Sequence, residues 1–265
     1  MQLRRLKWIS MFIIILGLMA CSASPTGRNQ LLLFSANDIS ALGAQSFAQM
    51  KQELPISNNV RKTRYVKCVS NALLAHVPPQ PGFDEWEVIL FDNPQINAFA
   101  LPGGKIGIYS GLLTVAVNQD QLATVIGHEI AHVLANHSNE RLSQAQLAQT
   151  GLQITDIALS GSEFAQHRDV TMAALGVGVQ YGLIMPYGRR QETEADRIGL
   201  QLMAQAGFDP RQSVELWRNM ARASMGRQPP ELLSTHPSHS SRIQDLTERI
   251  NQLPNTTSTY PSCVL

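Results

Sequence analysis

The residues from Gly127 to His132 read Gly-His-Glu-Ile-Ala-His, an HExxH motif. On a helix, His128 and His132 leave the same face one turn apart, so both imidazoles can bind one metal ion. Glu129 lies about 100° around that helix, where its carboxylate can act as a base on water without being a ligand. This spacing predicts a zinc site for hydrolysis, although a five-residue pattern also arises by chance.

The element that must present this motif is a helix over about residues 118–137. No Pro interrupts the segment, and its small residues Gly127 and Ala131 leave room for another backbone. Its apolar residues recur at helical spacing, at Leu122, Val125, Ile126, Ile130, Val133 and Leu134.

A catalytic zinc ion needs a third protein ligand, and the predicted helix over residues 189–206 offers two glutamates. Helical phase places Glu194 on a polar stripe that we expect to be solvated, with Arg197, Gln201 and Gln205. Glu192 and Asp196 lie on the other face, which must pack inward. The phase therefore favours Glu192 as the third ligand.

The remaining pattern predicts an α+β fold that is mainly helical, with a small local β-sheet beside the HExxH helix. The strands are expected at 85–92, 96–101 and 105–109, the last two joined by a turn at 102–104. Further helices are expected at 35–54, 58–77, 139–160, 167–185, 210–223 and 239–253. Residues 173–185 are nearly all apolar but too few to span a membrane, which favours a buried helix; a lid over the site is the alternative.

The start of the chain indicates export. Three basic residues precede a short apolar run, as in a signal peptide over residues 1–20. Leu18-Met19-Ala20-Cys21 is similar to the bacterial lipobox, in which Cys21 carries lipid; an uncleaved anchor or an ordinary signal peptide is the alternative. Because Ser22 rather than Asp follows, the resemblance implies an outer-membrane lipoprotein of a Gram-negative bacterium, facing the periplasm.

This interpretation divides the chain into a signal peptide (1–20), a lipidated tether (21–30), a metallopeptidase domain (31–253) and a C-terminal tail (254–265). Removal of residues 1–20 leaves 245 residues and changes the formal charge from +1 to −2, because three basic and no acidic residues are lost. A nucleic-acid partner is therefore not expected.

Two further cysteines, Cys68 and Cys263, remain once Cys21 is assigned to lipid. In an oxidising compartment they can form a disulfide that ties the tail to the domain. The alternative is that Cys68 is a buried apolar residue and Cys263 a free thiol.

Three motifs in this order resemble one family: the HExxH motif, the segment Glu192-Thr193-Glu194-Ala195-Asp196, and Asn-Ala-Phe-Ala-Leu-Pro-Gly-Gly at 97–104. They are similar to the HtpX-type and CAAX prenyl proteases, and to their periplasmic lipoprotein branch, which includes LoiP and BepA. The resemblance covers about residues 31–253. It implies a zincin-like fold and one zinc ion per chain, bound by His128, His132 and Glu192. Glu129 would be the base, and Asp196 would assist at the transition state.

Two departures limit what the resemblance implies. We find no set of transmembrane helices and no tetratricopeptide extension like that of BepA, so we expect a minimal lipoprotein protease domain. The expected function is a zinc endopeptidase that degrades misfolded or unassembled envelope proteins. The alternative is a chaperone-like lipoprotein that keeps the zinc site but does not cleave.

Two further predictions concern the surroundings of the zinc ion. The strand with Asn97, Ala98 and Phe99 could bind an extended peptide along its edge, or could serve only to pack the helices. The Thr-His-Pro segment at His236 is similar to one in BepA whose His can fill the open zinc position. We therefore expect His236 as a reversible fourth ligand on a gate over residues 226–241, with His239 the weaker candidate.

Overall fold

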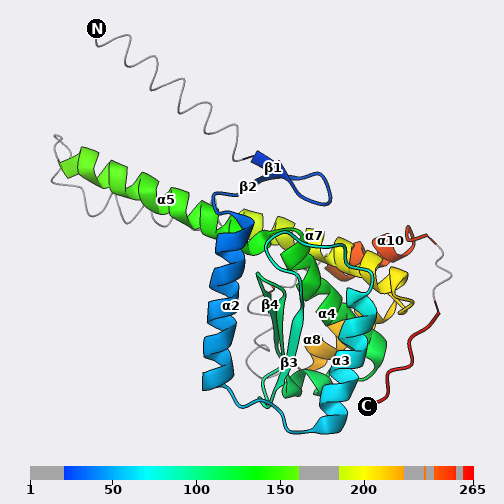
Figure 1. The fold of residues 1–265 in the computed structure, drawn as a ribbon. Coiled ribbons are helices and arrows are strands. Elements are labelled where there is room, and N and C mark those ends of the chain that lie inside the picture. Colours follow the sequence, from blue (N-terminus) through cyan, green and yellow to red (C-terminus); the bar gives the residue numbers. More distant parts are fainter. Residues whose placement is uncertain (1–20, 161–184, 224–235, 237–241, 255–258) are drawn as a thin grey trace. The chain divides into compact units, whose positions relative to one another are not determined.

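The computed structural model describes residues 21–160, 185–223, 236, 242–254 and 259–265 (Figure 1). The expected signal peptide, nearly all of the predicted helix 167–185, and His239 with most of the expected gate lie outside these residues. The chain forms two compact units. One comprises Met1–Ser35 with Asn136–Gly188, and the other comprises Ala36–Ala135 with Arg189–Leu265.

The larger unit contains a three-stranded sheet in the order β3-β5-β4. Strand β3 (Glu87–Phe91) runs parallel to β5 (Lys105–Tyr109), and β4 (Ala98–Leu101) pairs with β5 antiparallel. The turn between β4 and β5 needs φ values of 81° and 70° at Gly103 and Gly104, which residues with a Cβ rarely adopt. The predicted hairpin is confirmed, and β4 is an edge strand of the sheet.

The two faces of this sheet pack against different helices because side chains alternate along a strand. One face joins the main core beside α4 (Gln119–Leu134) through Leu90, Ala98, Ala100, Ile106 and Ile108. The other face presents Phe91, Phe99 and Tyr109 to Phe47 of α2 (Ala36–Glu53). The small alanines of β4 therefore face the HExxH helix.

Helices α3 (Val60–Leu74) and α4 both begin at an asparagine cap. Asn59 Oδ1 accepts from the amide of Lys62 at 3.0 Å, and Asn118 Oδ1 accepts from that of Gln121 at 2.9 Å. Between β5 and α4 lies a short 3-10 helix, η1 (Ser110–Thr114). Asn136, at a left-handed φ of 53°, follows the end of α4.

Helix α7 (Met185–Gln205) crosses α4 at two glycines. A Cβ on Gly199 would lie 3.0 Å from the backbone nitrogen of His128, and one on Gly127 would lie 3.3 Å from the Gly199 carbonyl oxygen. The close crossing brings side chains from α7 to the HExxH face of α4. Helices α8 (Gln212–Ala223) and α10 (Arg242–Ile250) complete the described helices of this unit.

The C-terminal tail is fixed to the same unit. Cys68 on α3 and Cys263 form a disulfide, which is one of the two alternatives that the sequence left open. Gln119, in the first turn of α4, donates to the Pro261 carbonyl oxygen at 2.6 Å and accepts from the Cys263 amide at 2.8 Å. The Tyr260 hydroxyl donates to Asp120 at 2.6 Å. The tail therefore holds the start of the HExxH helix.

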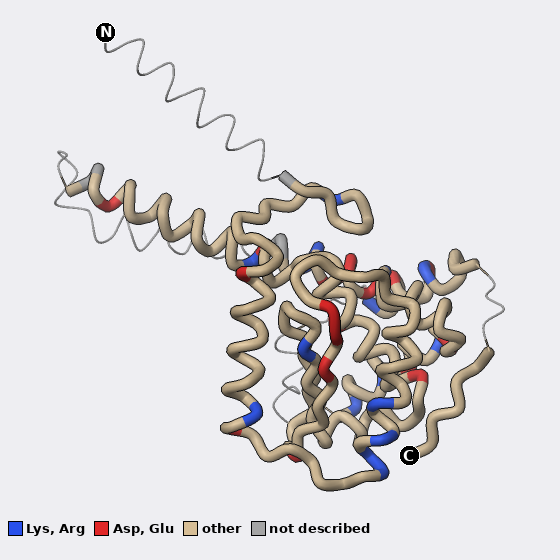
Figure 2. Tube along the Cα trace, in the orientation of Figure 1, with Lys and Arg blue, Asp and Glu red and all other residues tan. Residues whose placement is uncertain are grey.

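The smaller unit contains β1 (Cys21–Ala23), β2 (Asn29–Leu31) and α5 (His137–Ser160). The expected tether at 21–30 forms an antiparallel hairpin here, a regular structure that its turn-forming composition did not suggest. The two terminal guanidinium nitrogens of Arg28 bind the Glu140 carboxylate, at 2.6 and 2.7 Å. Beyond Ser143, α5 carries one charged residue, Asp156 (Figure 2). Among the described residues, no helix is both long and apolar enough to cross a membrane.

Candidate metal centre

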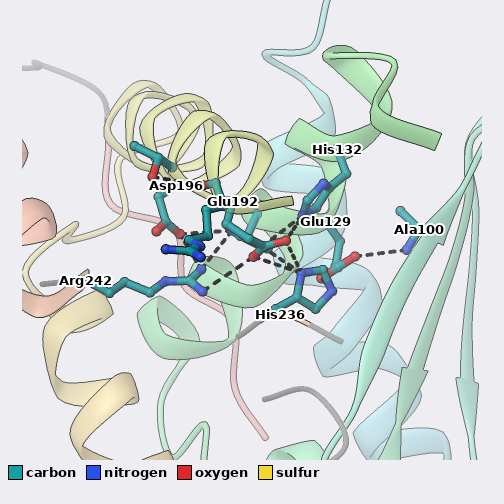
Figure 3. Close-up of polar contacts among 10 residues, drawn as sticks. Ala100, Glu129, His132, Glu192, Asp196, His236 and Arg242 are labelled. Atoms are coloured by element: carbon teal, nitrogen blue, oxygen red, sulfur yellow. Dashed lines mark hydrogen bonds and ion pairs between the residues drawn. The ribbon is translucent and has the colours of Figure 1, made fainter. Parts of the chain in front are cut away.

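Four buried side chains converge in the larger unit (Figure 3). His128 and His132 come from α4, Glu192 comes from α7, and His236 precedes α10. One potential ligand atom from each lies within 4.8 Å of the other three. Three imidazoles and a carboxylate form a donor set that suits zinc.

The separations of these atoms are comparable with those around a tetrahedral zinc ion. Ligands about 2.0 Å from zinc at tetrahedral angles lie about 3.3 Å from one another. His128 Nε2 lies 3.0 Å from His132 Nε2, 3.2 Å from His236 Nδ1 and 3.2 Å from Glu192 Oε2. Glu192 Oε1 lies 3.0 Å from His236 Nδ1 and 3.5 Å from His132 Nε2. These five separations, which involve both Glu192 oxygens, are close to that value, so the cluster is compact enough to hold one zinc ion.

The charges of the cluster are strongly coupled. Burial alone would lower the pKa of His128, but hydrogen bonds to Asp196 and Glu192 raise this pKa to about 9. Burial alone would raise the pKa of Glu192, but His128 and His236 hold this carboxyl pKa far below its usual range. A proton on His128 and the ionised Glu192 carboxylate therefore stabilise each other, and zinc, which needs the neutral imidazole, would displace that proton.

Both carboxylate oxygens of Glu129 lie near a nitrogen atom. Oε2 accepts from the backbone amide of Ala100 on the edge strand β4, at 3.2 Å. Oε1 lies 3.3 Å from His236 Nε2 but makes no well-aligned hydrogen bond. His236 thus contributes one ring nitrogen to the ligand cluster and turns the other toward the candidate base.

Asp196 and Arg242 form a second layer behind the ligands. Asp196 Oδ1 lies 3.0 Å from His128 Nδ1, so it accepts from this nitrogen and leaves Nε2 facing the cluster. Arg242 donates to the same oxygen at 2.6 Å. Asp196 is therefore placed to orient His128.

Arg242 is the main site residue that the sequence analysis missed. It is 4 % exposed, and its guanidinium carbon lies 3.8 Å from the centre of the Trp217 ring. The available signal was its place on α10, where Arg242, Leu246 and Ile250 follow one another at four-residue intervals on one face. A charged residue on the apolar face of an amphipathic helix needs a buried partner.

Of the two glutamates weighed as the third ligand, Glu192 lies where it was expected and Glu194 does not. The structure places Glu192 in the cluster, as the helical phase predicted. The predicted solvation of Glu194 is wrong, because this residue is 5 % exposed. The prediction assumed that only one face of α7 packs against the protein. The helix is buried around more of its circumference, at Gln191, Glu192, Glu194 and Ala195.

The candidate substrate residues lie at the edge strand, but they do not all face the metal cluster. Asn97 Oδ1 accepts from the amide of Ala98, and the Asn97 carbonyl accepts from Tyr109. The ring of Phe99 lies over Gly107 on the α2 face of the sheet. The backbone that reaches the site is that of Ala100, through Glu129.

A small cleft adjoins Glu129 and His128. Its apolar wall consists of Val125, Leu216, Trp217 and Met220.

Comparison with known proteins gives consistent matches. Residues 61–250 match the sequence profile of peptidase family M48. The chain is 35 % identical over 240 residues to metalloendopeptidase OMA1 of Bos taurus. This alignment covers 86 % of this chain and 45 % of the relative. It is 31 % identical over 218 residues to the β-barrel assembly-enhancing protease of Escherichia coli (strain K12), covering 80 % of this chain and 44 % of the relative. The chain thus spans about half the length of these relatives.

Proposed function

This chain belongs to peptidase family M48 and carries an HExxH-plus-glutamate metalloendopeptidase site, and we propose that it cleaves proteins of the bacterial periplasm while held at a membrane by lipid. One observation carries the enzymatic part of this proposal. Four potential ligand atoms lie within 4.8 Å of one another, with the Glu129 carboxylate beside them and the edge strand β4 within hydrogen-bonding distance of that carboxylate.

Zinc bound by His128, His132 and Glu192 would acidify water and polarise a peptide carbonyl. Glu129 takes the proton from the attacking water and returns it to the leaving amine as the C–N bond breaks. The backbone of β4 offers an edge to which an extended substrate can add as a further strand, with little dependence on its sequence. The amide of Ala100 becomes available to this substrate when it leaves Glu129.

The position of His236 supports a self-inhibited resting state. Its Nδ1 occupies the fourth corner of the ligand cluster, where water would otherwise bind, and its Nε2 faces Glu129. The His236 side chain would thus exclude the attacking water from the metal and also stand beside Glu129, the base that the reaction needs. We expect His236→Ala to retain zinc and cleave casein several-fold faster; an unchanged rate at equal zinc content would contradict this inhibition.

A non-cleaving, chaperone-like lipoprotein is the alternative function. Casein degradation before and after removal of zinc by a chelator, and again after zinc is restored, separates the two. A protease loses and regains cleavage. A chaperone leaves casein intact throughout while still suppressing the aggregation of an unfolded protein.

The proposed location rests on the lipobox-like sequence at Cys21 and on similarity to the LoiP-type lipoprotein branch. We propose sorting to the outer membrane and misfolded or unassembled envelope proteins as substrates. Cys21→Ala should release the protein from the membrane fraction and leave the casein-cleaving activity of the released protein unchanged. Sedimentation of this variant with membranes after a high-salt wash would place the anchor elsewhere.

A further inference from the structure

Arg242 occupies a buried position between the two carboxylates behind the ligand cluster. Its Nη2 donates to Asp196 Oδ1 at 2.6 Å, and its Nη1 lies 3.5 Å from Glu192 Oε2 (Figure 3). The short contact to Asp196 is a charge-assisted hydrogen bond, whereas the longer one to Glu192 is a weak contact. Asp196 is thus the main partner of Arg242.

A ring on α8 fixes the guanidinium from the side. The plane of Trp217 lies against it at 3.8 Å, and Arg242 is 4 % exposed. Stacking on a tryptophan favours arginine over lysine, because the flat delocalised guanidinium matches the ring face. The guanidinium therefore has little freedom to turn away from Asp196.

Arg242 reaches the metal ligand His128 by two routes: its Nη2 lies 3.4 Å from His128 Nδ1, and it binds Asp196 at the shorter distance of 2.6 Å. The same Oδ1 atom of Asp196 that binds Arg242 lies 3.0 Å from His128 Nδ1. A carboxylate at this nitrogen fixes the tautomer and the ring orientation of a ligating histidine. Loss of the guanidinium leaves the Asp196 carboxylate, with 12 % of its side chain exposed, free to turn toward solvent.

We infer that Arg242 is a positioning residue for zinc, which acts through Asp196 on His128 and is itself held by Trp217. This inference rests on the proposed zinc site. In this role Arg242 does not contact the substrate. Its consequence is that zinc affinity, and not only cleavage, depends on a side chain that cannot itself be a ligand.

The test is competition for zinc between the purified protein and a chromophoric chelator. Arg242→Gln should weaken zinc binding about 10- to 100-fold, the range found when partners of ligating residues are removed. Arg242→Lys keeps the charge but loses the planar fork, so its loss should be smaller. The matched control is Arg249→Gln, two turns further along α10, which should bind zinc within about twofold of wild type.

The role of Asp196 is tested by a double-mutant cycle. If Arg242 acts through Asp196, the losses from Arg242→Gln and Asp196→Asn should not multiply in the double variant. Multiplying losses, or wild-type affinity in Arg242→Gln, would overturn the inference. Circular dichroism of the zinc-free protein shows whether Arg242→Gln folds. If it does not fold, zinc binding by Arg242→Lys is the test, and a wild-type zinc affinity in that variant would overturn the inference. A wild-type protein that binds no zinc would instead refute the proposed function.

Discussion

The two ends of α4 are held by different kinds of contact. At its start, Gln119 and Asp120 bind the tail that the disulfide of Cys263 ties to α3. Further along, the helix crosses α7 at Gly127 and presents ligand residues to the metal cluster. The start of α4 is thus held only by contacts within the protein, whereas a metal ion bound to the cluster would also hold its later part.

This difference separates stability from chemistry along one helix. Contacts at the start of α4 lower the free energy of the folded state but touch no reacting group. Contacts at the crossing determine where His128 and Glu192 meet. Changes at the start should therefore affect unfolding alone, and changes at the crossing should affect zinc binding as well.

The largest effect is expected at the ligand end. Glu192→Ala should abolish casein cleavage and lower zinc content together, because only two histidines hold the ion once His236 leaves the fourth position for water to bind. Metal analysis of the purified variant and a casein assay measure both quantities.

The matched control is Glu194→Gln on the same helix. This variant should keep zinc, although it should lose about 1–3 kcal/mol of stability because the side chain is buried. Zinc loss in this variant with zinc retained in Glu192→Ala would show that the ligands are assigned wrongly.

An intermediate effect is expected at the crossing. Gly199→Val places methyl groups where even a Cβ would lie 3.0 Å from the His128 nitrogen, so α7 must move away from α4. We expect a loss of stability of about 1–3 kcal/mol and weaker zinc binding. Thermal unfolding of the zinc-free protein and chelator competition measure the two.

Gly151→Ala in α5 is the corresponding control, because nothing lies within 4 Å of its added Cβ. It should stabilise the protein by up to about 1 kcal/mol. Unchanged zinc affinity in Gly199→Val would mean that the glycine crossing does not position the ligands.

The smallest effect on chemistry is expected at the start of α4. Replacing Cys68 and Cys263 together by Ser should reduce the free energy of unfolding by about 2–5 kcal/mol. Zinc affinity and the casein cleavage rate at 25 °C should stay at wild-type values. A loss of zinc affinity comparable to that of Gly199→Val would show that the tail also positions the ligands.

Patterns of neighbouring residues predicted the start of α4 well, and they placed the HExxH motif on this helix correctly. The helix expected from about residue 118 begins at Gln119, and β5 has the predicted bounds of residues 105–109. These features depend on residues close together in the chain, so a sequence pattern contains them. The choice of Glu192 also succeeded, because helical phase separates two residues on one helix.

Features that depend on distant residues were harder to predict. Arg242 meets Asp196 46 residues away, and its role follows only from the packing of α10 against α8 and α7. Glu194 is buried although it lies on a polar stripe. The pairing of Cys68 with Cys263 stayed open from the sequence because nothing local brings the two thiols together.

The central claim is that Glu129 performs the chemistry while other residues hold zinc. The most direct test is to measure casein cleavage by wild type and Glu129→Gln at matched zinc content. The amide keeps the size of the carboxylate but cannot act as a base. We predict one zinc ion per chain in both proteins and no detectable cleavage by Glu129→Gln. Cleavage at a rate comparable to wild type, or loss of zinc from this variant, would contradict the account.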